Sequence, residues 1–206
     1  MLALVGCTVR YGDVVALDGV TLRVAPGERV AVCGPNGAGK STLLRALLDA
    51  ALAAAPPARG APPPAVFVPQ EPPSELDLSL SAHDYAMLGR TPYLSAWRRP
   101  SAADERAVAA ALDAVGLAGF ARRRLAALSG GERRRLALAL ALASEAPALL
   151  LDEATAHVDP DGLREILAAL AQTGRTVVMS IHARPLPDGF FTRVVALEHG
   201  RIATEK

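Results

Sequence analysis

A glycine-rich run in the first quarter of the chain has the residue types and spacing of a phosphate-binding loop. Residues 34–42 read G-P-N-G-A-G-K-S-T, which fits the P-loop pattern G-x-x-x-x-G-K-[ST]. The run Arg29–Cys33 before it predicts a buried strand, and the run Leu43–Leu48 after it predicts a helix. Strand, loop and helix in this order are the context in which such a loop wraps phosphate oxygens.

The residue types within the loop predict how it holds a nucleotide. Gly34, Gly37 and Gly39 allow tight turns that bring backbone N–H groups against phosphate. We expect Lys40 to reach the β- and γ-phosphates and Ser41 to hold Mg²⁺ through its hydroxyl. Lys40 is one of two lysines among 22 Lys and Arg residues, which favours a specific need for a compact ammonium. The other nucleotide-binding residues predicted in the loop are Asn36, Ala38 and Thr42.

Two carboxylates follow a second buried strand. The apolar run Leu149–Leu151 ends in Asp152 and Glu153. The carboxyl ends of parallel strands face the crevice in which such sheets bind ligands. We therefore expect Asp152 to hold Mg²⁺, directly or through water, and Glu153 to polarise the water that attacks the γ-phosphate. Without the upstream loop, a strand that ends in solvated acids is the simpler interpretation.

A second glycine-containing segment precedes a helix predicted at Gly131–Ala143. Its sequence is Leu128-Ser129-Gly130-Gly131-Glu132. Two glycines before a helix N-terminus predict a further anion-binding surface. Ser129 and Glu132 also have the spacing of a capping box, which predicts an ordinary helix start. The two interpretations are compatible.

The rest of the chain alternates strands and helices, which predicts an α/β fold with a mostly parallel sheet and helices on both faces. Residues 74–127 are expected to form an all-helical insertion, and the proline-rich run Ala55–Pro64 to form an exposed loop. Further helices are predicted at Ser81–Arg90, Ser101–Val115 and Gly162–Gln172. Further strands are predicted at Leu2–Arg10, Val20–Val24, Ala65–Val68, Thr176–Ser180, Thr192–Leu197 and Arg201–Thr204.

Composition narrows the class of protein. A chain of 206 residues with 51% hydrophobic residues is long and apolar enough for one sizeable folded core. A net charge of +1 gives no electrostatic argument for nucleic acid, so the arginine runs 122–124 and 133–135 are interpreted as solvated or partner-docking faces, with nucleic-acid binding as a minor alternative. No run reaches the roughly 18 apolar residues of a membrane span. No signal peptide is visible, and Cys7 and Cys33 are expected to be buried thiols in a reducing cytoplasm.

Together, these motifs resemble the ATP-binding subunit of an ABC transporter. Residues 34–42 resemble the family's Walker A motif, and Asp152 and Glu153 resemble its Walker B motif with the catalytic glutamate. Residues 128–132 resemble the LSGGQ signature, with Glu132 in place of Gln. The signature is the diagnostic motif, because other P-loop ATPases lack it.

The resemblance assigns roles to four more residues and implies ATP and Mg²⁺ as cofactors. Tyr11 resembles the aromatic residue that stacks on adenine, although packing at a strand end is an equal alternative. Gln70 resembles the Q-loop glutamine, which contacts Mg²⁺ and the membrane partner. Asp159 resembles the D-loop aspartate. His182 resembles the switch histidine, which contacts the γ-phosphate and would act with Lys40 and Glu153 in catalysis.

The family's fold is a P-loop NTPase core with an antiparallel β-subdomain and an inserted helical subdomain, here expected at 74–127 within a single domain, 1–206. Lys40 and Gln70 are only 30 residues apart (70 − 40), which is shorter than usual in the family and predicts a trimmed β-subdomain. Ala154 stands where relatives carry Pro, and Leu140 where many carry Arg.

The resemblance also implies partners. The family's ATPases form head-to-tail dimers, so a second copy or a homologous ATPase is expected, together with transmembrane permease subunits and, in importers, a substrate-binding protein on the far side. The chain would then be cytoplasmic and peripheral on the inner face of the membrane, and no nucleic acid is expected. The run Leu88–Leu94 is similar to importers of iron–siderophore, haem or cobalamin, with ordinary packing as an equal alternative. Two alternatives remain: an exporter ATPase, such as a haem exporter for cytochrome assembly, and a non-transport ABC ATPase acting in DNA repair or on ribosomes.

Overall fold

The computed structural model describes residues 1–58, 60–70, 79–94, 99–153, 160–181 and 189–205, without the side chains of 160 and 161. The strands are β1 (Leu2–Tyr11), β2 (Val14–Val24), β3 (Arg29–Cys33), β4 (Val66–Val68), β5 (Ala148–Asp152), β6 (Thr176–Ile181), β7 (Arg193–Glu198) and β8 (Arg201–Glu205). The helices are α1 (Lys40–Ala54), α2 (Ala82–Met87), α3 (Ala102–Ala114), α4 (Gly130–Ala143) and α5 (Pro160–Gln172). Short 3₁₀ helices lie at Leu88–Tyr93, Ala118–Phe120 and Leu125–Ala127.

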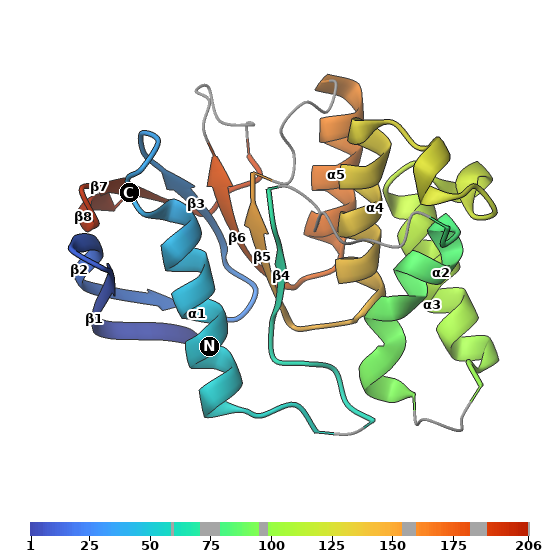
Figure 1. Ribbon diagram of the computed structural model, residues 1–206, viewed down its shortest axis with the longest axis horizontal. Coiled ribbons are helices and arrows are strands. Elements are labelled where there is room, and N and C mark those ends of the chain that lie inside the picture. Colours follow the sequence, from blue (N-terminus) through green and yellow to red (C-terminus); the bar gives the residue numbers. More distant parts are fainter. Residues whose placement is uncertain (59, 71–78, 95–98, 154–159, 182–188, 206) are drawn as a thin grey trace.

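The central sheet has six strands in the order β4-β5-β6-β3-β7-β8. All neighbouring pairs are parallel except β7 and β8, which form the predicted closing hairpin. The predicted α/β fold is therefore confirmed. Because β3, β4, β5 and β6 run in the same direction, their carboxyl ends lie at one edge of the sheet (Figure 1).

Helices cover both faces of this sheet, and the burial of β5 shows why. Leu149 and Leu151 pack in the core beside α4 and α5, whereas Leu150 packs in the core beside α1. Successive side chains of a strand point to opposite faces, so a run that is apolar throughout needs a cover on each side. Figure 1 shows α1 on one side of the sheet and α4 and α5 on the other.

A separate two-stranded antiparallel sheet, β1 and β2, packs on α1. The described residues 55–58 and 60–65 contain no strand, in agreement with the predicted proline-rich loop and trimmed β-subdomain. Strand β2 starts at Val14, well before the predicted start. Gly19, the residue before the predicted start, has a φ of 62° and donates its N–H to the Thr8 hydroxyl at 3.0 Å. This glycine lies within the strand at an irregular stretch of the ladder and does not end it.

The regular structure in the described part of 74–127 is helical, apart from an isolated bridge between Ser81 and Arg124. Its helices α2 and α3 pack on α4 in one apolar core, and the partly buried side chain of Leu140 packs against this core. Each of α2 and α3 begins with a capping box, at Ser81 and Ser101. The boundaries 74–127 and the status of this part as a subdomain stay predictions.

Arg90 ties this helical part to the end of α4. Its guanidinium donates to the Asp104 carboxylate at 2.9 Å and to the Ala143 carbonyl at 2.9 Å, and it also pairs with Glu145. The ring of Tyr93 lies 3.8 Å from the guanidinium carbon. The cation thus meets a carbonyl group at the C-terminus of a helix, where positive charge is favourable. We call these five residues the Arg90 cluster.

Three smaller expectations concern membrane spans, the burial of the two cysteines and a disulfide between them. Among the described residues, no helix is both long and apolar enough to cross a membrane. Cys33 is buried as predicted, whereas Cys7 is only half-buried, and no disulfide joins the two.

Candidate nucleotide-hydrolysis site

The P-loop connects β3 to α1 and is held from two sides by backbone. A Cβ atom on Gly34 would collide with the carbonyl oxygen of Leu197 in β7, and one on Gly39 would collide with that of Ala16 in β2. Gly39 also has a φ of 101°, a conformation that favours glycine. These glycines are therefore required by close approach as well as by the turn.

The N-terminus of α1 is open toward the loop. Gly39 occupies the N-cap position and supplies no side-chain hydrogen bond, so the first backbone N–H groups of the helix are available to an anion. Ser41 and Thr42 lie in this first turn, and Asn36 and Gly37 lie exposed in the loop. The local geometry is that of a phosphate cradle.

Lys40 is folded back over the loop. Its ammonium donates to the carbonyl of Gly34 at 2.9 Å and to that of Pro35 at 3.1 Å, and the residue is 6% exposed. Two carbonyl dipoles thus hold a cation at the mouth of the loop. A phosphate that enters the loop meets this charge already in place.

The turn between β7 and β8 closes the back of the loop, a feature that the sequence interpretation missed. Gly200 donates its N–H to the Ala38 carbonyl at 3.1 Å, and its own carbonyl accepts from the Asp18 N–H at 2.9 Å. A Cβ on Gly200 would crowd the backbone of Ala16 and Leu17. The only signal in the sequence is a glycine in a hairpin turn, which does not name its distant contacts.

The acidic pair lies at the carboxyl edge of the sheet, as expected. Asp152 ends β5 and is 4% exposed, and one of its oxygens accepts a hydrogen bond from the Ser180 hydroxyl at 2.7 Å. Glu153 follows with a φ of 47°, in the left-handed region that non-glycine residues rarely adopt. The backbone therefore turns sharply between the two carboxylates.

Gln70 and Glu153 are brought together by strand pairing. Val68 in β4 is the register partner of Leu151 in β5, so the two chains leave the sheet side by side. The side-chain amide of Gln70 donates to the Glu153 carboxylate at 2.9 Å. Because Nε2 donates, the amide oxygen is the atom that Gln70 can offer to a cation.

The residues predicted to hold Mg²⁺ offer only oxygen: the Ser41 hydroxyl, the Asp152 carboxylate and the Gln70 amide. Mg²⁺ prefers such ligands and is commonly held by one or two carboxylates together with phosphate oxygens. The Asp152 carboxylate is oriented by Ser180 before any cation arrives. This donor set fits the ion.

The signature segment forms a capped helix start. Ser129 is the N-cap of α4: its N–H donates to the Glu132 carboxylate at 2.6 Å, and its hydroxyl accepts from the Glu132 N–H at 3.2 Å. Hydrogen bonds to its carboxylate from the Ser129 N–H and then from the Ser129 side chain, followed by the charges of Arg123 and Arg135, lower the pKa of Glu132 below its ordinary value. The predicted capping box is confirmed. Binding of an anion by Ser129, Gly130 and Gly131 stays a prediction.

The structure does not bring the signature segment to the P-loop of the same chain. Helix α4 lies on the opposite side of the central sheet from α1 (Figure 1).

Tyr11 ends β1 opposite Val14, at the tip of the hairpin, and is 57% exposed, so adenine stacking stays a prediction. Asp159 and His182 lie outside the described residues.

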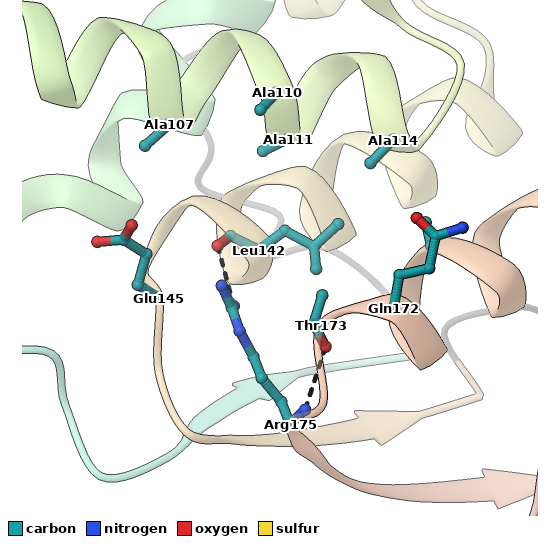
Figure 2. A pocket seen from close by; sticks show the side chains of 10 residues that line it. Ala107, Ala110, Ala111, Ala114, Leu142, Glu145, Gln172, Thr173 and Arg175 are labelled. Atoms are coloured by element: carbon teal, nitrogen blue, oxygen red, sulfur yellow. Dashed lines mark hydrogen bonds between the residues drawn. The ribbon is translucent and has the colours of Figure 1, made fainter. Parts of the chain in front are cut away.

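A groove of about 310 Å³ lies elsewhere, between α3 and the C-terminal ends of α4 and α5. Figure 2 shows alanines of α3 facing Arg175, whose guanidinium donates to the Leu142 carbonyl at 3.0 Å. Arg175 directly precedes β6, so this groove is at the opposite end of the strands from the P-loop. It is no part of the nucleotide site.

Comparisons with known proteins agree with this geometry. The family model described as ABC transporter matches residues 17–156. The hemin import ATP-binding protein HmuV of Streptomyces coelicolor is 39% identical over 96% of this chain and 75% of its own length. The iron(3+)-hydroxamate import ATP-binding protein FhuC of Bacillus subtilis is 32% identical over 96% of this chain and 78% of its own length.

Solved structures show the same fold. A dimeric ATP-binding cassette in a post-hydrolysis state, bound to ADP and phosphate, superposes with a TM-score of 0.82 at 26% identity, over 100% of this chain and 98% of that one. A putative metal-chelate type ABC transporter in an inward-facing conformation has a TM-score of 0.78 at 27% identity, over 100% of this chain and 82% of that one.

Proposed function

This chain belongs to the ABC transporter family, and on that premise we propose that it is the ATP-hydrolysing subunit of an importer for a metal chelate of the iron–siderophore, haem or cobalamin class. One observation carries the hydrolytic role: Gln70, Asp152 and Glu153 meet at the carboxyl edge of the sheet. The cargo class is supported by the relatives named for hemin and iron(3+)-hydroxamate import. These import proteins favour uptake over the export alternative.

The residues of the P-loop and of the carboxyl edge of the sheet have proposed roles that their surroundings support. The P-loop N–H groups and Lys40 bind the β- and γ-phosphates. Ser41, Asp152 and the Gln70 amide oxygen would hold Mg²⁺, which would neutralise charge on the transferring phosphoryl group. Glu153 orients the attacking water and accepts its proton. Asp159 and His182 complete the site according to the family resemblance.

The active unit is a head-to-tail dimer. Within one chain the sheet separates the signature segment from the P-loop side, so a second copy or a homologous ATPase supplies Ser129, Gly130, Gly131 and Glu132 to the γ-phosphate. The dimer sits on the inner face of the membrane and docks to permease subunits near Gln70 and the helical part of the chain. A substrate-binding protein on the far side delivers the cargo.

The hydrolytic role is tested with Glu153→Gln. We expect a fluorescent ATP analogue to bind as tightly as to the wild type, and kcat to fall by about 100-fold or more, because general-base catalysis typically contributes 10²–10⁴-fold. Glu165→Gln, an exposed glutamate on α5, is the matched control and should keep wild-type turnover. Wild-type kcat in Glu153→Gln would remove Glu153 from the mechanism.

The cargo is tested by uptake. Cells that lack the gene, with and without a plasmid copy, are supplied with labelled ferric siderophore, hemin or cobalamin. Loss of uptake of one of these cargoes, restored by the wild type but not by Glu153→Gln, supports the importer. Unchanged uptake together with intracellular accumulation of haem would identify an exporter instead.

A further inference from the structure

We propose that Ser180 is a positioning residue for ATP hydrolysis, whose hydroxyl fixes the Asp152 carboxylate and the backbone turn at Glu153 together. This inference rests on the roles proposed above for Asp152 and Glu153. It concerns a residue of β6 that none of the predicted motifs includes. Its chemistry is a single hydroxyl group placed between the ligand of the cation and the general base.

Strand register places this hydroxyl. In the parallel pair of β5 and β6, Ser180 is the register partner of Asp152. Register partners in a parallel pair point to the same face, so the two side chains lie next to each other. The Ser180 Oγ lies 2.7 Å from an Asp152 oxygen and 2.9 Å from the backbone nitrogen of Glu153.

The hydrogen bonds around Ser180 can be directed in only one way. The carboxylate is an acceptor, so the single proton of the hydroxyl goes to Asp152. The lone pairs of the same oxygen then accept the Glu153 N–H. One atom therefore fixes the rotation of a carboxylate and the position of the next peptide group.

Burial makes this arrangement hard to replace. Ser180 is 1% exposed, and the residues before it in β6, Val177, Val178 and Met179, are buried and apolar. Water has little access to substitute for a missing hydroxyl, and a buried carboxylate oxygen without its donor is unfavourable. The hydrogen bonds with Asp152 and Glu153 explain the presence of a polar residue in this apolar strand.

The backbone at Glu153 needs this support. Its φ of 47° is a conformation that persists only where the surroundings hold it. The turn directs the Glu153 side chain to Gln70, whose amide lies 2.9 Å from its carboxylate. Loss of the Ser180 acceptor would release the peptide N–H and let both carboxylates move away from the place where the nucleotide reacts.

The test compares Ser180→Val with Ser180→Thr. Threonine and valine have nearly the same shape, and only threonine keeps the hydroxyl, so the pair separates hydrogen bonding from added volume. We expect Ser180→Val to lower kcat by about 10–100-fold, the usual loss when a group that orients a metal ligand is removed. We expect Ser180→Thr to restore most of that loss.

A second readout does not depend on turnover. A fluorescent ATP analogue is titrated into each variant in EDTA and in Mg²⁺. In EDTA all variants should bind as the wild type does, because the P-loop is unchanged. The gain in affinity on adding Mg²⁺ should be smaller in Ser180→Val than in the wild type and in Ser180→Thr. Thermal unfolding of each variant shows whether it is folded at the assay temperature.

Two outcomes would overturn the proposal. Ser180→Val could keep wild-type kcat and a wild-type Mg²⁺ gain, or both variants could lose activity equally in step with their Tm, which would indicate a merely structural role. If Ser180→Val does not fold, Ser180→Ala takes its place and the same outcomes decide. Full turnover in Glu153→Gln would instead overturn the proposed roles, whereas an inactive Glu153→Gln beside a fully active Ser180→Val overturns this inference alone.

Discussion

Two polar networks of this chain are built in different ways. In the Arg90 cluster, an arginine that is 5% exposed is surrounded by a buried carboxylate, the carbonyl at the end of a helix and an aromatic ring. The site network runs from buried Ser180 and Asp152 to half-buried Glu153 and exposed Gln70. The first is mostly enclosed, whereas the second reaches the solvent.

The difference fits the roles that we propose for the two networks. A buried cation is tolerable only if its partners are fixed within the protein, so the Arg90 cluster is expected to contribute to stability and to have no role in chemistry. A catalytic network must exchange partners when a ligand arrives. The hydrogen bond between Gln70 and Glu153 is at the surface, where a nucleotide, a cation and water can compete for both groups.

The largest effect is expected from breaking the enclosed network. Arg90→Met should lower the free energy of unfolding by about 3–5 kcal/mol, because it leaves buried Asp104 without its cation. The affinity of the folded variant for ATP should not change. Urea unfolding and nucleotide titration measure the two quantities. Arg201→Met removes an exposed ion pair with Asp18 and should cost less than about 1 kcal/mol. Equal losses of unfolding free energy in Arg90→Met and Arg201→Met would contradict the special status of the enclosed network.

The opposite pattern is expected at the open site. Lys40→Met should weaken ATP binding by about 10–100-fold, because it removes charge-assisted hydrogen bonds worth about 1.5–3 kcal/mol, with a much smaller change in unfolding free energy than Arg90→Met. Arg45→Met removes a positive charge from the exposed face of the same helix and should bind ATP normally. An unchanged affinity in Lys40→Met would count against the P-loop assignment.

Acid should weaken the enclosed network. Hydrogen bonds from the Ser101 hydroxyl and N–H, and then the Arg90 guanidinium, lower the pKa of Asp104 from its ordinary 3.8 to about 2. A carboxyl whose pKa is lower in the folded state stabilises the fold above its unfolded pKa, and this contribution is lost as the pH falls from about 4 to about 2. Urea unfolding at several pH values should therefore show a shallower slope in this window for Asp104→Asn than for the wild type. The same slope in both would exclude Asp104 as the cause.

The smallest effect is a loss of unfolding free energy expected from removing the serine hydroxyls that cap two helices. Ser129→Ala should cost about 1 kcal/mol of unfolding free energy, the usual value of an N-cap. Ser101→Ala should cost more, because the Ser101 hydroxyl donates to Asp104, a buried member of the Arg90 cluster, whereas Glu132 is exposed to a greater extent. Urea unfolding of both variants tests the order. A larger loss in Ser129→Ala would mean that the contact with the Arg90 cluster adds no stability to the Ser101 cap.

Local patterns predicted much of the fold and part of the site. The run 34–42 and the strand before it predicted the P-loop, and the spacing of Ser129 and Glu132 predicted a capping box, because these features depend on neighbours in the sequence. The acidic pair was placed at the correct edge because an apolar strand precedes it. Its hydrogen bond with Gln70 was not predictable without knowing that β4 pairs with β5.

Contacts between distant segments account for what was missed. The sequence around Ser180 does not indicate a role for it, and the proposed role follows only from its register with Asp152. The run Leu88–Leu94 was interpreted as a subgroup feature or as ordinary packing, and the structure shows Arg90 and Tyr93 bound to residues 143–145, far along the chain. Sequence patterns do not reveal the order of strands in a sheet, and both contacts depend on tertiary arrangement.

The position of β3 also bears on how the protein is synthesised. Its two neighbours, β6 and β7, both lie in the last third of the chain, and the start of β6 is 143 residues beyond Cys33 (176 − 33). At roughly 5–20 residues per second, translation of that interval takes on the order of 7–30 s. We expect the P-loop to remain unassembled on the ribosome for this time. Nascent chains arrested before Arg193 should not retain ATP, whereas chains released after Glu205 should.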